Sequence, residues 1–149
     1  MINLIKKWLI SLGSPPLFFK WASKILPWFF PISILILLTG LIWGIGFAPT
    51  DYKQGDVYRI IFIHVPSAIL GQSIYLMMAI FGFICLIWRA KLAGMFLRSA
   101  APIGASFTLI ALVSGAVWGK PTWGTWWVWD ARLTSTLILF FLYAGIISL

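Results

Sequence analysis

Tryptophan is concentrated in one short segment of this chain. Five indoles, those of Trp118, Trp123, Trp126, Trp127 and Trp129, lie in residues 118–130, between two strongly apolar segments. Exposed indole rings are stabilised only by contact with another apolar surface, which here is a lipid interface, a partner protein or a planar cofactor such as haem. Membrane proteins do gather tryptophan at the lipid interface. Five rings in one segment broken by glycine and proline exceed what an anchor needs.

His64 is the one histidine of the chain, and it lies in the apolar stretch IFIHVPS. An ionisable side chain inside such a stretch is costly and tends to face the interior of a helix bundle or a cavity. Neutral imidazole is a good iron ligand and a frequent axial ligand of haem. The alternative is a histidine that hydrogen-bonds a neighbouring helix or reaches the interface. The residue pattern leaves both interpretations open.

Three charged residues stand close to these groups. Asp130 directly precedes the last apolar segment, where it is predicted to cap a helix N-terminus. Arg132 can pair with Asp130, or it can meet an anionic group such as a haem propionate. Arg59, about one helical turn before His64, has the same two options. Because the chain has only three aspartates and no glutamate, we expect binding rather than enzymatic catalysis.

The composition is that of a membrane protein. Of the 149 residues, 62% are hydrophobic and 9% are charged, and the mean hydropathy is +1.02. Long uncharged apolar stretches in such a chain indicate membrane-spanning helices. The net charge of +8 comes from short clusters between the apolar stretches, which is typical of membrane topology and argues against nucleic-acid binding.

We therefore predict an all-α, polytopic transmembrane helix bundle that forms a single membrane domain over residues 1–149. The predicted parts are an interfacial segment (1–27) broken by Pro15 and Pro16, spans at about 28–47, 60–88, 99–118 and 133–149, and a Trp-rich loop (118–132). The last span is still apolar at Leu149, so we expect this sequence to be part of a longer chain.

The distribution of Lys and Arg predicts the orientation. One side of the membrane receives Lys6, Lys7, Lys20, Lys24, Arg89, Lys91 and Arg98, whereas the other receives Lys53, Arg59, Lys120 and Arg132. The positive-inside rule then places the N-terminus in the cytoplasm. It places the Trp-rich loop, the loop at 51–59 and the start of the second span, with His64, at the outer face.

Small residues recur at helical spacing within the predicted spans. The pairs are Gly40 with Gly44, Ser67 with Gly71, and Ala101 with Ala105. Such spacing allows helix backbones to approach closely in a membrane. It predicts a compact bundle and does not indicate a function.

Two segments resemble a known family. Residues 123–134, WGTWWVWDARLT, resemble the tryptophan-rich signature of the haem-handling membrane proteins of cytochrome c maturation. Residues 64–68, HVPSA, together with the short N-terminal region, resemble the CcmC branch of that superfamily. The resemblance covers essentially the whole chain.

The resemblance implies a multi-pass protein of the bacterial inner membrane with six spans. Such a protein holds b-type haem non-covalently, in transit, at the periplasmic face. It delivers the haem to the periplasmic chaperone CcmE, helped by CcmD and associated with the CcmAB transporter. Its implied axial ligand here is His64, and its haem platform is Trp118, Trp123, Trp126, Trp127, Trp129 and Asp130. The family's second histidine lies in a later outer loop, which this sequence does not contain.

Two other functions fit the residues. The first is a transporter subunit that moves haem across the bilayer, for which Ser67, Gly71, Gln72 and Tyr75 offer a thin polar path. The second is a scaffold that binds no haem and whose Trp-rich loop grips only a protein partner.

Overall fold

The structure is a computed structural model, and it describes residues 14–149. Its elements in order are helix α2 (Pro15–Leu41), the π-helix η1 (Ile42–Phe47), the 3₁₀-helix η2 (Asp56–Ile60), and helices α3 (Ile61–Trp88), α4 (Lys91–Trp123) and α5 (Ala131–Ser148). These residues form no β-strand. The predicted all-α class is confirmed.

Within residues 14–149, four helical segments are long and apolar enough to cross a membrane. They are 15–47, 56–88, 91–123 and 131–148. A span of the hydrocarbon core requires about 20 residues, so three of the four exceed the minimum. The chain is therefore a multi-pass membrane protein.

Pro15 and Pro16 form the first turn of a helix, which begins where the break was predicted. Helix α2 begins at Pro15 and continues through Pro27 and Pro31 into the first span. Proline is tolerated in the first turn of a helix because the N–H groups there have no intrahelical partner. Residues 15–27 are therefore part of the first long helix, whereas the rest of the predicted interfacial segment, residues 1–13, lies outside the described residues.

The predicted start of the Trp-rich loop at residue 118 is also wrong. Helix α4 continues to Trp123, past Gly119 and Pro121. It ends at Gly124, whose φ of 79° is left-handed and whose N–H donates to the Lys120 carbonyl over 3.0 Å. A glycine in this conformation is a frequent helix terminator. We call residues 124–130 the Trp loop, because only three of the five clustered indoles lie there.

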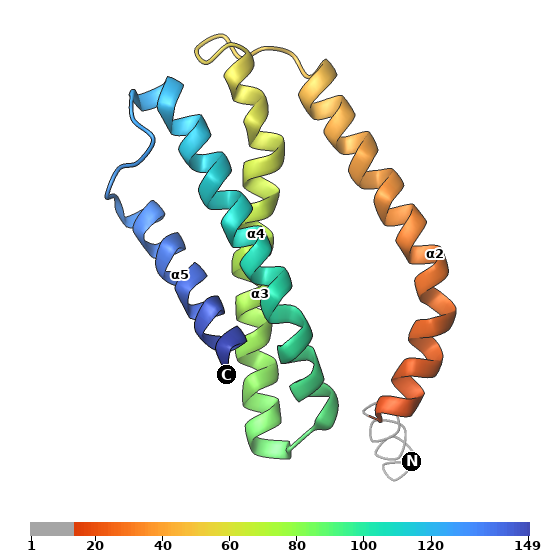
Figure 1. Ribbon diagram of the computed structural model, residues 1–149. Helices are drawn as coiled ribbons and strands as arrows, with labels where there is room; N and C mark the ends of the chain where they lie inside the picture. Colours follow the sequence, from red (N-terminus) through yellow and green to blue (C-terminus); the bar gives the residue numbers. More distant parts are fainter. Residues whose placement is uncertain (1–13) are drawn as a thin grey trace, which may run out of the picture.

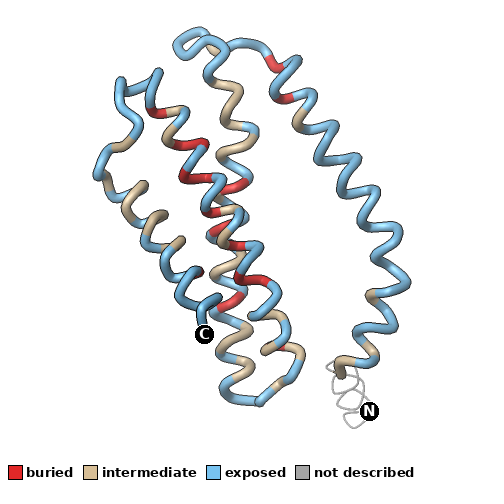
Figure 2. Tube along the Cα trace, viewed as in Figure 1, coloured by how far each residue is buried: buried red, intermediate tan, exposed pale blue. Residues whose placement is uncertain are grey.

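Helices α3, α4 and α5 pack together, and α2 stands apart from them (Figure 1). Buried residues follow α4 along most of its length, whereas none of the α2 residues is buried (Figure 2). Helix α4 is thus the centre of the bundle, and the side chains that position any site must meet it.

Tyr143 holds α5 against the α3–α4 pair. Its ring is fully buried, and its hydroxyl donates to the Gly71 carbonyl over 2.7 Å. A Cβ atom at Gly104 would overlap the Tyr143 ring, and one at Gly71 would lie 2.7 Å from the Thr108 hydroxyl. The close approach expected at Gly71 is therefore found. The sequence pattern did not single out Gly104 or Tyr143.

Candidate functional site

The two segments expected at one face do lie at one end of the bundle. The loop between η1 and η2 and the Trp loop are both at the end opposite the start of α2 and the α3–α4 connection (Figure 1). The Trp118 indole N–H donates to the Gln54 side-chain oxygen over 2.8 Å and so ties the first loop to α4. The arrangement agrees with the sides inferred from Lys and Arg.

A cavity of about 560 Å³ opens beneath this end, between α3, α4 and α5. Its lining includes His64 from α3, Trp118 and Trp123 from α4, and Arg132 from α5. Small-molecule sites in proteins commonly have volumes of about 300–1,000 Å³. We call this space the His64 cavity.

Three residues of α4 lie against the His64 ring. Its Nδ1 lies 3.0 Å from the Ser114 hydroxyl oxygen. Its Cε1 lies 3.0 Å from where a Cβ at Gly115 would stand, so the absence of a side chain there lets the ring approach the helix. The Trp118 ring meets it edge to face, with centroids 5.6 Å apart and an interplanar angle of 71°. This half-buried imidazole is therefore fixed in orientation.

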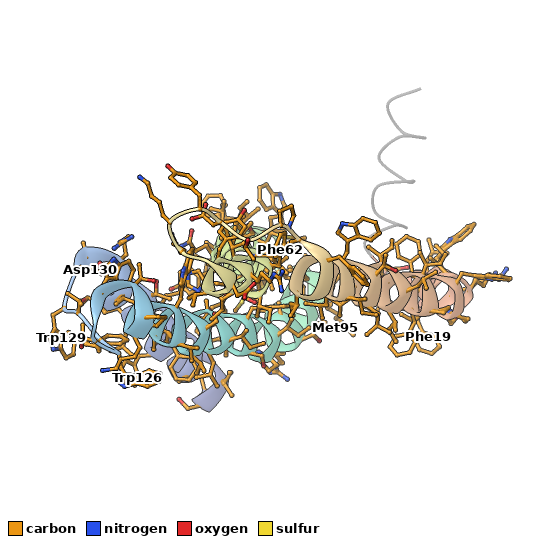
Figure 3. All side chains as sticks on the ribbon, turned by 90° about the horizontal axis from the view of Figure 1, so that it is seen from above. Phe19, Phe62, Met95, Trp126, Trp129 and Asp130 are labelled. Atoms are coloured by element: carbon orange, nitrogen blue, oxygen red, sulfur yellow. The ribbon has the colours of Figure 1, made fainter. Side chains whose placement is uncertain are left out.

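The remaining indoles lie outside the cavity lining. Trp126 and Trp129 are 57% and 75% exposed and project from the edge of the bundle farthest from α2 (Figure 3). Trp127 is half-buried and meets the Trp129 ring edge to face at 5.4 Å. Its indole N–H is buried without a hydrogen-bond partner among the described residues. The five indoles thus form two groups, with Trp118 and Trp123 at the cavity and Trp126, Trp127 and Trp129 in the Trp loop.

Asp130 caps α5, as its position in the sequence predicts. Its carboxylate accepts from the Leu133 backbone N–H over 2.8 Å and pairs with the Arg132 guanidinium at 2.8 Å. The Leu133 hydrogen bond, and then the Arg132 hydrogen bond, hold the pKa of Asp130 below its usual value. Arg132 also lies over the Trp123 ring, at 5.6 Å from its centroid. The cap therefore places Arg132 at the cavity.

Arg59 is placed elsewhere. Its Nε donates to the Ala48 carbonyl over 3.2 Å, and its guanidinium is 3.4 Å from the Asp56 carboxylate. It lines a second, shallower hollow with Val117 and Pro121. The structure thus gives it local partners on the loop and does not bring it to the His64 cavity.

Three residues that position His64 or Trp118 were not singled out from the sequence. Ser114 and Gly115 contact the His64 ring, and Gln54 holds Trp118. Ser114 lies one helical turn before Trp118, and residues at this spacing share a helix face. The spacing could therefore have predicted that Ser114 lies near the same site as Trp118. The sequence offered no such signal for Gln54. It lies 64 residues before Trp118, and the two meet only because of the path that its loop takes.

Comparison with known proteins gives the family. Residues 8–149 match the family model described as CcmC: Heme exporter protein C. The chain is 54% identical over 143 residues to the Heme exporter protein C of Escherichia coli (strain K12), which covers 96% of this chain and 58% of that protein. It is 48% identical to the protein of that name from Haemophilus influenzae, again over 96% of this chain and 58% of the relative.

A third relative of that name, from Paracoccus denitrificans, is 48% identical over 92% of this chain and 56% of its own length. The chain thus spans somewhat more than half the length of each of these relatives. The match includes the helices, the His64 cavity and the Trp loop described above. The chain belongs to the CcmC family.

Proposed function

We propose that this chain binds haem at the outer face of the bacterial inner membrane and passes it on for the maturation of c-type cytochromes. The observation that carries the proposal is the His64 cavity, where one imidazole, two indoles and one guanidinium line a single space. The relatives named above are heme exporters by name, which supports haem as the cargo.

The cavity residues fit the chemistry of haem. A porphyrin is a flat apolar ring with an iron at its centre and two carboxylates at one edge. The Trp118 and Trp123 rings supply aromatic surface, the His64 imidazole supplies a nitrogen ligand, and Arg132 supplies a cation near the mouth. The volume of about 560 Å³ is in the range of sites for molecules of this class. Arg59 would act only on a haem that also reached the outer loop.

Delivery is assigned to the Trp loop. Trp126 and Trp129 present exposed indole surface and do not line the cavity. Exposed aromatic residues are favoured in protein–protein contacts. We propose that the periplasmic chaperone CcmE docks here, with CcmD and CcmAB as further partners and membrane lipid around the spans.

Contacts deep in the bundle disfavour the transporter alternative. The polar path proposed for it runs through Gly71, where the fully buried Tyr143 fills the space between α3 and α4. Ser67 is also engaged, since its hydroxyl donates to the Ile63 carbonyl of its own helix over 2.7 Å. These contacts favour a site open to the outer face over a channel through the bundle.

The test is a native absorption spectrum, with a pyridine haemochrome assay for haem content, on membranes that contain the protein, its partners and available haem. We expect His64→Ala to lose most of the haem that the wild type carries and to shift the absorption spectrum of the remainder, because the imidazole ligand is gone. Val65→Ala is the matched control, since Val65 is an exposed neighbour on the same helix. Equal haem content and equal spectra in the wild type and His64→Ala would remove His64 from the iron. The absence of haem from the wild type and from both variants would favour the alternative in which the protein is a scaffold that binds no haem.

A further inference from the structure

We infer that Ser114 is a positioning residue that holds His64 in the tautomer whose Nε2 is free to bind a metal. The inference rests on the proposed function, because it assigns His64 to the haem iron. It adds that Nε2 is the nitrogen that binds the iron and that the Ser114 hydroxyl keeps this nitrogen unprotonated.

The Ser114 hydroxyl lies close to the backbone of its own helix. The hydroxyl oxygen lies 2.6 Å from the Ile110 carbonyl of the preceding turn and 3.3 Å from the Ala111 carbonyl. A carbonyl can only accept, and a serine hydroxyl has a single proton. The shorter distance therefore assigns that proton to Ile110, as is usual for serine inside a membrane helix.

The remaining contact then fixes the imidazole. With its proton directed to Ile110, the Ser114 oxygen can only accept from the His64 Nδ1, which is 3.0 Å away. Nδ1 must therefore carry the hydrogen, and in a neutral imidazole the other nitrogen is then an unprotonated acceptor. Among the described residues, the side-chain hydrogen bond of His64 is made by Nδ1, and the Ala111 backbone also lies within hydrogen-bond reach of the ring. The nitrogen left for a ligand in the His64 cavity is Nε2.

The orientation of the ring is set by the same helix face. Ser114, Gly115 and Trp118 lie within about one turn of α4, the first two beside Nδ1 and Cε1 of the imidazole and the third edge to face with the ring. Trp118 is held in turn by Gln54. Metal-binding histidines generally donate their other N–H to a fixed acceptor, and loss of that acceptor typically costs about 10–100-fold in affinity.

The first test is made without haem. Histidine labelled with ¹⁵N is incorporated into the membrane-embedded protein, and the His64 signals are assigned by their absence from His64→Ala. We expect a protonated Nδ1 and an unprotonated Nε2 in the wild type. We expect a mixture of tautomers in Ser114→Ala, and a return to the single tautomer in Ser114→Thr, which keeps a hydroxyl. A protonated Nε2 in the wild type, or an unchanged tautomer in Ser114→Ala, would overturn the inference.

The second test adds ferric haem to the same proteins. We expect Ser114→Ala to bind it roughly tenfold more weakly than the wild type, with Ser114→Thr close to wild type. Ser106→Ala is the matched control, because the Ser106 hydroxyl also bonds within α4, to the Pro102 carbonyl, but is exposed. It should bind like the wild type.

The outcomes separate this inference from the proposed function. If His64→Ala binds haem as the wild type does, His64 is not the ligand and the proposed role fails, whatever the tautomer. If His64→Ala loses haem while Ser114→Ala matches the wild type in both affinity and tautomer, only the role of Ser114 is refuted.

Discussion

Among the clustered indoles, neighbouring residues have different surroundings. Trp126 and Trp129 are exposed, whereas Trp127 between them is half-buried with its N–H shielded from solvent. An exposed indole next to a binding cavity contributes to contact with a partner, while a buried one contributes to the shape of the loop. Asp130 completes the segment by capping α5 and holding Arg132. The loop therefore combines a contact surface with its own structural support.

This difference predicts different phenotypes for alanine variants. Trp126→Ala and Trp129→Ala should slow haem transfer to the chaperone roughly tenfold or more, since tryptophan contacts at interfaces often contribute about 2 kcal/mol. Their unfolding should remain that of the wild type. Trp127→Ala should instead lower the free energy of unfolding by about 1–3 kcal/mol.

Transfer is measured with purified chaperone and unfolding by denaturant titration in detergent. Normal transfer by both Trp126→Ala and Trp129→Ala would refute the docking surface.

Among the helices, the packing of α5 depends on the Tyr143 side chain and on the space that Gly104 leaves for it. Tyr143 enters the space left by Gly104, donates to the Gly71 carbonyl and meets the Tyr75 ring edge to face at 5.3 Å. Close helix contacts at glycine are a main source of stability inside membranes. Because α5 carries Arg132, this contact also determines where the guanidinium stands relative to His64.

Filling this space should therefore destabilise the bundle. Gly104→Ala places a methyl group against the Tyr143 ring and should cost about 1–3 kcal/mol in the free energy of unfolding. Gly82→Ala is the matched control, since a Cβ at Gly82 meets no atom within 4 Å. Its stability should be unchanged or slightly higher, because alanine favours helix. Equal unfolding midpoints for the two variants would contradict the role assigned to Tyr143.

For the molecule as a whole, the loops define two ends. The loop between η1 and η2 and the Trp loop share one end, and the α3–α4 connection with its basic residues lies at the other (Figure 1). The excess of Lys and Arg at the latter end predicts that it faces the cytoplasm. On this prediction, the His64 cavity opens toward the periplasm.

Single-cysteine labelling in intact cells tests this orientation. The sequence has one cysteine, Cys85, which is first replaced by alanine. We expect Lys53→Cys and Thr125→Cys to react with a maleimide that crosses only the outer membrane, because both positions lie at the cavity end. Lys91→Cys should react only after the inner membrane is opened. The reverse pattern would place the cavity in the cytoplasm and refute periplasmic delivery.

The sequence alone determined the features that depend on local composition. Apolar length predicted the helical spans, the charge pattern predicted which loops share an end, and the position of Asp130 predicted the cap of α5. These follow from the cost of exposing polar groups to lipid and from the unpaired N–H groups of a helix start. The motif around Trp126 and the HVPSA segment were enough to point to the CcmC family.

Only the tertiary structure decided which residues meet. Gly119, Pro121 and Gly124 are all potential helix terminators by composition, but α4 ends at Gly124, which alone of the three adopts a left-handed φ. Because α4 ends there, Trp118 and Trp123 lie on the helix and not in the Trp loop. Similarly, Ser114 reaches His64, and Tyr143 reaches Gly71, across 50 and 72 residues of chain. Such pairs depend on the rotation and spacing of packed helices, which local sequence does not encode.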